Sequence, residues 1–279
     1  MTSTALTRFL YVAVLALVLW GAEYVRRDLW EPDEARYAYV AWEMAETGRV
    51  FVPQRNGEAY SHKPPLMFWL IRAASIVTGG VPNGLSARLP SLLGGILALW
   101  VIAQLGQRWF GTATGWLAPL VCAATGRFWH QGGWGQIDML LCGLVLAAVY
   151  LLFRYDEDRA QWRAALAFCC MGLGILAKGP VGLIVPVGIY IGGNLAAGEL
   201  RRCRHWAWAW GLPLALLWPA AWLGLAALEG APGWYFEELF FAQTFSRAAG
   251  QFGGHAQPLF YYLLYVPLDF MPWTVLVPA

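Results

Sequence analysis

The residues best suited to chemistry lie in one polar segment, residues 26–88, between two strongly apolar stretches. The segment holds two notable runs, EPDEARY at 31–37 and YSHKPPL at 60–66. Carboxylates, an imidazole and a lysine are costly beside hydrocarbon, so their concentration in a mostly apolar chain marks a functional segment. These groups suit proton transfer and phosphate binding. Residues 26–88 are therefore our candidate for a catalytic loop.

The first run opens an amphipathic helix that we predict over residues 33–47. Its apolar face consists of residues at helical spacing, namely Tyr37, Val40, Ala41 and Met44. Carboxylates at positions 33 and 34 suit the positive N-terminus of a helix, and Gly48 suits its end. One carboxylate satisfies that role, so Asp33 and Glu34 are also candidate catalytic residues. Arg36, one turn from Asp33, can pair with Asp33 or with a lipid phosphate.

The second run presents two polar side chains ahead of a double proline. Proline fixes the backbone, so His62 and Lys63 are held in a defined direction. Lys63 is one of only two lysines in the chain, and the other basic residues of the loop are arginines. Lysine is a compact charge suited to phosphate, which makes Lys63 a candidate phosphate-binding residue.

Three more ionisable residues lie at the ends of apolar stretches. Asp138 begins one stretch and Lys178 ends another. Both are candidates for the rim of a site, with helix capping and snorkelling as their respective alternatives. His255 precedes the last stretch, where a hydrogen-bonded structural role is the alternative. Together with His62 and a carboxylate it could complete a divalent-metal site, although no fixed ligand spacing supports this.

The composition predicts an integral membrane protein that holds these residues on a helical bundle. The 279 residues are 59% hydrophobic and 13% charged, against about 25% charged in soluble domains. Eight stretches approach the length of about 20 apolar residues that a membrane crossing needs. They are 7–25, 89–107, 112–129, 136–153, 162–178, 180–197, 206–228 and 258–279. Pairs such as Leu89-Pro90 and Gly179-Pro180 predict helix starts.

The segment 65–80 is too short and too polar to cross, because Arg72 lies at its centre. If it lies on the membrane, the arginine-rich turns at 106–111, 154–163 and 198–205 share one side with the N-terminus. The positive-inside rule then predicts a cytoplasmic N-terminus. The candidate residues all fall at the opposite, extracytoplasmic end of the bundle: Asp33, His62, Lys63, Asp138, Lys178 and His255.

Several classes of function are excluded. The five cysteines are odd in number and form no C-x-x-C pair, so they suggest neither a disulfide framework nor a zinc site. A net charge of +2 without a basic patch argues against nucleic-acid binding. Nucleotide-binding and hydrolase motifs are absent, which argues against cytosolic nucleotide-activated substrates.

Six motifs in order along the chain resemble the GT-C glycosyltransferases that use polyprenyl-phosphate sugars. They are EPDEARY, KPPL, RLPS at 88–91, the Asp138 helix start, KGP at 178–180 and the H-x-x-P-x-x-Y-Y stretch from His255. The resemblance covers essentially the whole chain. It is narrowest to the bacterial branch that includes lipid A aminoarabinose transferase and is related to protein O-mannosyltransferases.

This resemblance implies an all-α polytopic bundle of about eight transmembrane helices, with two juxtamembrane helices in the first outer loop. It implies that Asp33 is the catalytic or site-organising acid and that Arg36 and Lys63 hold the carrier phosphate. Tyr60 and His255 match positions near the donor and a metal. The aminoarabinose transferases have Glu where this chain has His62, which leaves the sugar and any metal open.

We therefore expect a bacterial inner-membrane glycosyltransferase with a periplasmic active site in a single domain, residues 1–279. It would transfer a sugar, with inversion, from undecaprenyl phosphate to a lipid A, glycan or protein acceptor. Relatives continue into further helices, so we expect this chain to be the N-terminal portion of such a protein. The alternatives are a transporter or flippase of lipid-linked saccharides, for which Asp269 is the one candidate deep charge, and an inactive scaffold.

Overall fold

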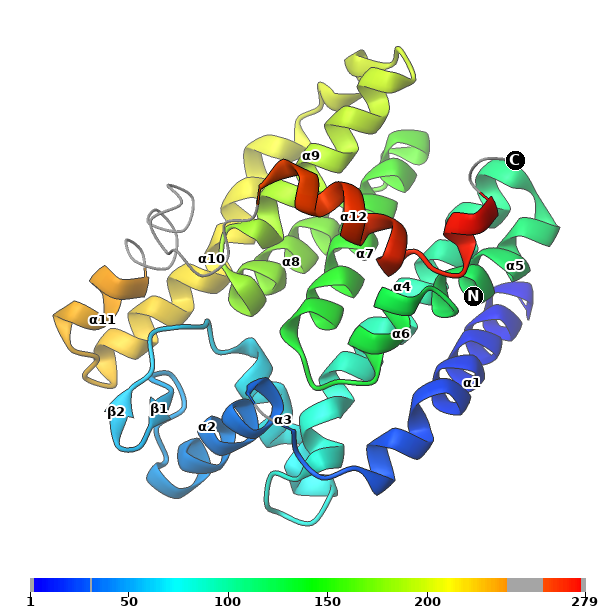
Figure 1. Cartoon of the computed structure of the whole chain (residues 1–279). Helices are drawn as coiled ribbons and strands as arrows, with labels where there is room; N and C mark the ends of the chain where they lie inside the picture. Colours follow the sequence, from blue (N-terminus) through cyan, green and yellow to red (C-terminus); the bar gives the residue numbers. More distant parts are fainter. Residues whose placement is uncertain (1–2, 31, 240–257, 277–279) are drawn as a thin grey trace.

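The computed structural model describes residues 3–30, 32–239 and 258–276, and it is almost entirely helical (Figure 1). The longer helices are α1 (Ser3–Arg26), α4 (Gly84–Phe110), α7 (Ile137–Asp158), α8 (Gln161–Lys178) and α10 (Ala207–Leu228). The shorter ones are α2 (Asp33–Thr47), α3 (Leu66–Val77), α5 (Thr112–Ala123), α6 (Gly126–Gly132), α9 (Val181–Ala196), α11 (Gly233–Glu237) and α12 (Leu259–Asp269). Two 3-10 turns, η1 (Leu200–Cys203) and η3 (Trp273–Leu276), and one hairpin, β1 (Gln54–Arg55) with β2 (Glu58–Ala59), complete it. The predicted all-α class is confirmed.

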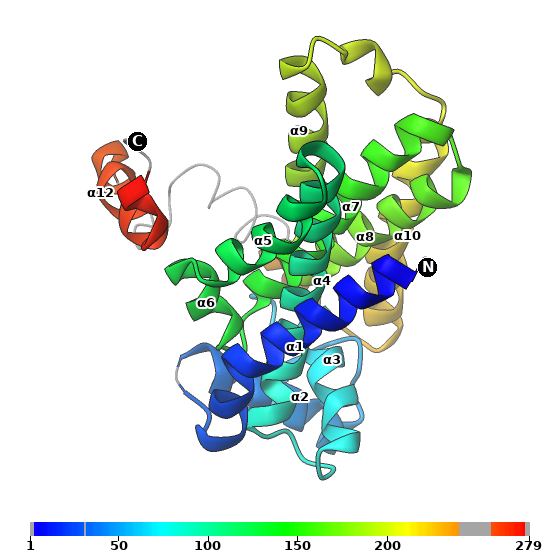
Figure 2. The ribbon, with the colours of Figure 1, turned by 90° about the vertical axis from the view of Figure 1, so that its right-hand side faces the viewer.

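Four described helices, α1, α4, α7 and α10, are long and apolar enough to cross a membrane. The predicted count of eight crossings is not confirmed. The stretch 112–129 is not one helix, because α5 ends at Ala123 and Thr125 has an extended backbone before α6. The stretch 258–279 is also wrong as a crossing, since α12 has only 11 residues. That helix lies beside α6 and apart from the central helices (Figure 2).

The two helices predicted in the first loop are present. Helix α2 covers the predicted range, and Gly48 ends it in the left-handed conformation with φ of 70°. Its buried face contains the four residues of the predicted stripe. Helix α3 has 12 residues, a length of about 18 Å, which is too short for a crossing. Both helices lie at the end of the bundle opposite α9 (Figures 1 and 2).

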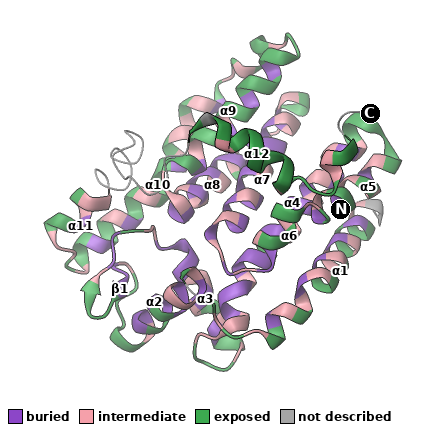
Figure 3. Ribbon diagram, in the orientation of Figure 1, coloured by how far each residue is buried: buried purple, intermediate pink, exposed green. Residues whose placement is uncertain are grey.

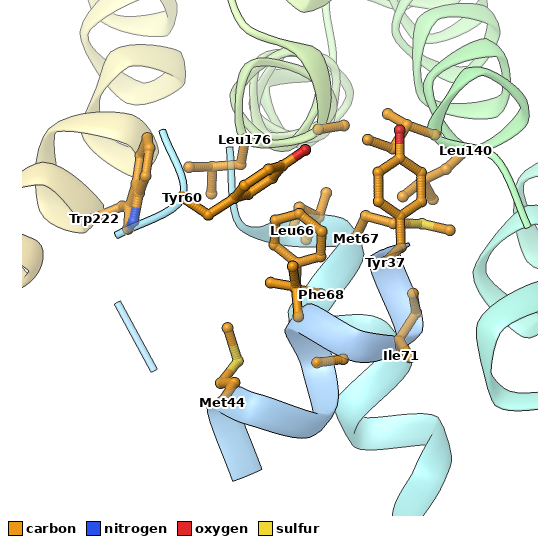
Figure 4. Packing of buried hydrophobic residues seen from close by; sticks show 14 of the residues in the cluster. Tyr37, Met44, Tyr60, Leu66, Met67, Phe68, Ile71, Leu140, Leu176 and Trp222 are labelled. Atoms are coloured by element: carbon orange, nitrogen blue, oxygen red, sulfur yellow. The ribbon is translucent and has the colours of Figure 1, made fainter. Parts of the chain in front are cut away.

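A buried aromatic and aliphatic cluster joins this loop to the bundle (Figure 4). The Phe68 ring of α3 contacts Tyr37 of α2 and Tyr60, with ring centroids 5.8 and 5.9 Å apart. Leu140 of α7, Leu176 of α8 and Trp222 of α10 pack into the same cluster. Burial of these apolar side chains therefore holds the loop against α7, α8 and α10.

The centre of the bundle is the crossing of α4 and α7, where buried residues concentrate (Figure 3). Gly94 and Gly143 let the two backbones approach closely, as small residues do in membrane bundles. Helix α4 begins at Gly84, where Asn83 and Ser86 form a capping box. The predicted start at Leu89-Pro90 was therefore wrong, and Pro90 lies inside the helix. The predicted start after Gly179-Pro180 is confirmed by α9.

We expect Gly94→Ala to destabilise the protein by about 1–3 kcal/mol, because overpacking forces the helices apart. A Cβ at Gly94 would lie 2.5 Å from the backbone of Leu140. The matched control is Gly188→Ala in α9, where a Cβ would have no neighbour within 4 Å. Thermal unfolding in detergent measures both variants. Equal midpoints for the two would contradict the assignment of Gly94 to a close contact between α4 and α7.

Candidate active site

A buried ion pair fixes the start of α2. The carboxylate of Glu34 and the guanidinium of Arg88 in α4 are both fully buried and paired by two hydrogen bonds of 3.0 and 2.8 Å. Glu34 also accepts hydrogen bonds from Arg27 and from the backbone N–H groups of Trp30 and Gly135. Burial alone would raise the pKa of Glu34, but the hydrogen bonds from Arg88, Gly135 and Trp30 outweigh it and the pKa is lowered.

This environment does not fit the prediction that Glu34 is a catalytic residue. Its two oxygens already accept five hydrogen bonds, so they have little capacity to accept a proton from a substrate. The side chain is fully buried and holds α2 against α4. We assign Glu34 to positioning and keep Asp33 as the candidate acid.

Asp33 and Arg36 form the predicted pair across one turn of α2, and both are partly exposed. The Arg36 guanidinium lies over the Tyr37 ring, 5.5 Å from its centroid. Partial burial alone would lower the pKa of Arg36, but Tyr60, Tyr37 and Asp33 nearby raise it. The Nε of Arg36 is buried and has no hydrogen-bond partner among the described residues. Arg36 therefore keeps donor capacity beyond its contact with Asp33.

Tyr60 connects this pair to the second run of the loop. Its ring is buried, lies 5.1 Å from the His62 ring and contacts Phe68. The hydroxyl groups of Tyr37 and Tyr60 point toward the same region (Figure 4). Burial raises the pKa of Tyr37, which keeps its hydroxyl protonated. Lys63 follows His62 directly and is partly buried. Tyr60 lies near enough to Arg36 to raise its pKa, as Asp33 does.

His62 faces a carboxylate that the sequence did not point to. Its Nε2 lies 3.5 Å from the Glu238 carboxylate, and the Ser61 hydroxyl donates to Glu238 at 2.5 Å. His62 is about half exposed. No group of three or more potential metal ligands occurs within residues 3–30, 32–239 and 258–276. His255, the other predicted ligand, lies outside the described residues.

The two predicted rim residues are brought together, because Lys178 at the end of α8 pairs with Asp138 in the first turn of α7. Their neighbours Ile137 and Ala177 belong to the buried cluster that contains Tyr37 and Tyr60. The pair is partly exposed at the edge of that cluster. Its carboxylate and ammonium therefore lie on the bundle side of the loop.

Three carboxylates that hold the loop were missed at the sequence level. Glu229 accepts hydrogen bonds from the backbone N–H groups of residues 50–52. Glu43 accepts from the N–H groups of Asn56 and Gly57 at the hairpin tip. Glu238 holds Ser61 and His62. Because carboxylates are rare in this apolar chain, their presence could have marked these residues as important. Their roles could not be predicted, because their hydrogen-bond partners lie up to 179 residues away in the sequence.

An open hollow of about 370 Å³ adjoins the candidate site. Arg36 and Tyr39 of α2 line one side, and Arg55 and Asn56 of the hairpin line another. Two guanidinium groups and a nearby carboxylate suit a substrate that carries phosphate and a reacting hydroxyl.

More than half of the chain matches a known protein family. Residues 62–224 match the family model described as dolichyl-phosphate-mannose-protein mannosyltransferase. The chain is 28% identical over 260 residues to the undecaprenyl phosphate-alpha-4-amino-4-deoxy-L-arabinose arabinosyl transferase of Shewanella sediminis, covering 91% of this chain and 46% of that protein. It is 28% identical to a transferase of the same name from Pseudomonas fluorescens, covering 95% and 49%. The chain thus spans about half the length of these curated relatives.

Among solved structures, the fold is similar to ArnT from Cupriavidus metallidurans. The crystal structure bound to undecaprenyl phosphate gives a TM-score of 0.81 at 24% identity, covering 100% of this chain and 50% of that one. The apo structure gives 0.77, also at 24% identity, covering 99% and 50%. These likenesses establish a shared fold.

We expect Arg88→Met to destabilise the protein by about 3–5 kcal/mol, because it leaves the buried Glu34 carboxylate without its main partner. The matched control is Arg36→Met, which breaks a partly exposed pair within α2 and should cost less than about 1 kcal/mol. Thermal unfolding in detergent compares the two. A similar loss of thermal stability in both variants would contradict the role of Arg88 in holding α2 in place.

Proposed function

The chain belongs to the dolichyl-phosphate-mannose-protein mannosyltransferase family, and on this basis we propose that it takes part in glycosyl transfer at a membrane. The donor in this proposal is a sugar linked to a polyprenyl phosphate such as undecaprenyl phosphate. The acceptor is a hydroxyl or phosphate group of lipid A, another glycan or a protein. Residues 26–88 form the catalytic loop of a domain that includes the whole chain.

The observation that carries the proposal is the unused hydrogen-bonding capacity of the Arg36 guanidinium. It pairs with Asp33 and still has a buried Nε without a hydrogen-bond partner among the described residues. A partly buried guanidinium whose Nε–H has no protein acceptor among the described residues favours a phosphate ligand, which it can bind through two parallel hydrogen bonds. Lys63, beside His62, supplies a second cation, and the names of the curated relatives specify an undecaprenyl phosphate donor.

The chemistry follows from where charge develops. When the bond between the sugar C1 and the phosphate oxygen breaks, its electron pair stays on the phosphate. Arg36 and Lys63 stabilise that negative charge, and Tyr60 helps to position the phosphate. The acceptor oxygen forms the new bond to C1 and loses its proton to Asp33. A single displacement of this kind inverts the configuration at C1.

Positioning provides the rest of the rate enhancement. Glu34, Arg88 and Glu229 hold the loop in place, so the reacting groups need little reorganisation. The Asp138–Lys178 pair forms the bundle-side rim. We place the site on the periplasmic face of a bacterial inner membrane and the N-terminus in the cytoplasm, because the arginine-rich turns lie at the other end.

The transfer chemistry predicts that Asp33→Asn and Lys63→Ala each reduce activity about 100-fold or more, since each removes a group that acts on developing charge. Membranes that contain the protein are supplied with labelled undecaprenyl phosphate-aminoarabinose or, separately, a mannose-linked carrier. Label transferred to lipid or glycan is then counted.

Glu46→Gln on the exposed face of α2 and Arg49→Ala in the following loop are the charge-matched controls. Both should retain activity. Unfolding temperatures of all four variants show whether a loss reflects misfolding. Full transfer by Asp33→Asn and Lys63→Ala would overturn the site assignment.

We also propose a divalent metal beside His62. Its imidazole and the Glu238 carboxylate, 3.5 Å apart, are two of the ligand types that zinc takes, and His255 is the candidate for a third. Such an ion would add positive charge near the carrier phosphate.

Metal analysis of the purified protein by mass spectrometry tests this. The wild type should retain zinc, and His62→Ala should lose most of it. His130→Ala should retain its zinc, since His130 stacks on Trp134 in another part of the fold. A wild-type protein without stoichiometric metal would refute the metal site and leave the transfer proposal intact.

A further inference from the structure

A second polar cavity lies at the opposite end of the bundle from the candidate active site. Its volume is about 670 Å³. It is lined by residues of α4, α7 and η1, namely Gln104, Gln107, Arg108, Trp109, Tyr150, Arg154, Glu157 and Arg202. The transfer chemistry proposed above uses none of these residues.

The charge of the lining is predominantly positive. Three arginines from three elements face one glutamate, Glu157, which pairs with both Arg108 and Arg154. Arg154 also donates to the Tyr150 hydroxyl at 3.0 Å. Arg202 pairs with Glu199, which is outside the lining. The cavity thus holds more cationic donors than its own carboxylate can neutralise.

An amide of the lining indicates which kind of ligand the cavity suits. The side-chain nitrogen of Gln104 is buried and has no hydrogen-bond partner among the described residues. A buried donor without an acceptor is costly, so an acceptor in the cavity would relieve that cost. Guanidinium groups together with an amide donor fit the oxygens of a phosphate group.

The position of the cavity indicates where that phosphate comes from. Arg88, which contacts Glu34 beside Asp33, lies near one end of α4, and Arg108 lies near the other. Twenty residues of helix span about 30 Å, which is the thickness of the hydrocarbon core. Trp109 lines the cavity and is 54% exposed, as tryptophans at a membrane interface are. The cavity therefore lies at headgroup level of the other membrane face.

We propose that this cavity binds a phosphate group, carried by the headgroup of an anionic membrane lipid on the face opposite the active site. Basic pockets between membrane helices bind such headgroups. Binding there would tie α4, α7 and η1 together.

The test uses the purified protein in phosphatidylcholine nanodiscs with and without phosphatidylglycerol. Phosphatidylglycerol should raise the unfolding temperature, because a ligand that binds only the folded state stabilises it. It should also remain bound in native mass spectrometry. Arg202→Gln should weaken binding about fivefold, the effect of one basic residue near an anionic lipid. Gln104→Met should also weaken phosphatidylglycerol binding, and it should not destabilise the lipid-free protein.

Arg201→Gln is the matched control, because Arg201 is exposed in the same turn but does not line the cavity. It should bind phosphatidylglycerol as the wild type does. Equal losses in Arg201→Gln and Arg202→Gln would overturn the proposal in favour of general surface charge, as would no response of the wild type to either phosphatidylglycerol or inorganic phosphate.

A separate arm replaces the lipid by inorganic phosphate in detergent. Protection by phosphate that Gln104→Met and Arg202→Gln both reduce would support the cavity as a phosphate site and identify free phosphate as its ligand. Protection by phosphatidylglycerol alone would identify the lipid. Neither readout involves sugar transfer, so both are independent of the proposed activity.

Discussion

The arrangement of this protein depends on the buried pair between Glu34 and Arg88. Two charges removed from water are tolerated only when each is paired and its remaining hydrogen-bonding groups are satisfied. The surroundings meet that condition: Arg88 also donates to the Tyr24 carbonyl in α1 and to the carbonyls of the two residues after Arg26, and Glu34 accepts from the turn before α7. One ion pair therefore joins α1, α2, α4 and the start of α7. Asp33, the adjacent residue, is held at the edge of this junction.

The same physical principle recurs along the loop that carries the candidate site. A loop beside a membrane has backbone N–H groups that neither a sheet nor lipid can satisfy. Carboxylates supply the acceptors here: Glu43 for the hairpin tip and Glu229 for residues 50–52. Glu238 in addition accepts from the Ser61 hydroxyl beside His62. These acids hold the loop, and Asp33 is the acid that the proposed transfer uses. The different exposure of Asp33 and Glu34 follows from about 100° of rotation between neighbouring residues of a helix.

The long central helices connect two chemically different ends. Helices α4 and α7 cross through close contact at Gly94 and Gly143, and they extend from the loop to the arginine-lined cavity. One end presents an acid, a lysine and tyrosine hydroxyls, which suit group transfer. The other end presents guanidinium groups and exposed aromatic residues, which suit contact with lipid headgroups. Because packed helices resist deformation, the distance between the ends stays close to the thickness of a membrane.

Local patterns in the sequence determined much of this picture. The 3.6-residue stripe and Gly48 predicted α2 and its end, and the short polar stretch at 65–80 predicted a non-crossing α3. The concentration of ionisable residues predicted one functional loop, whereas Tyr60 entered only through the resemblance to the GT-C glycosyltransferases. Local patterns misassigned the stretches 112–129 and 258–279 and the start of α4, and they did not reveal that Glu34 is buried. Glu34 pairs with a residue 54 positions away, and the loop carboxylates pair with partners up to 179 positions away. Only the tertiary structure decides such roles, because whether a carboxylate is buried or available depends on which distant donors the fold brings to it.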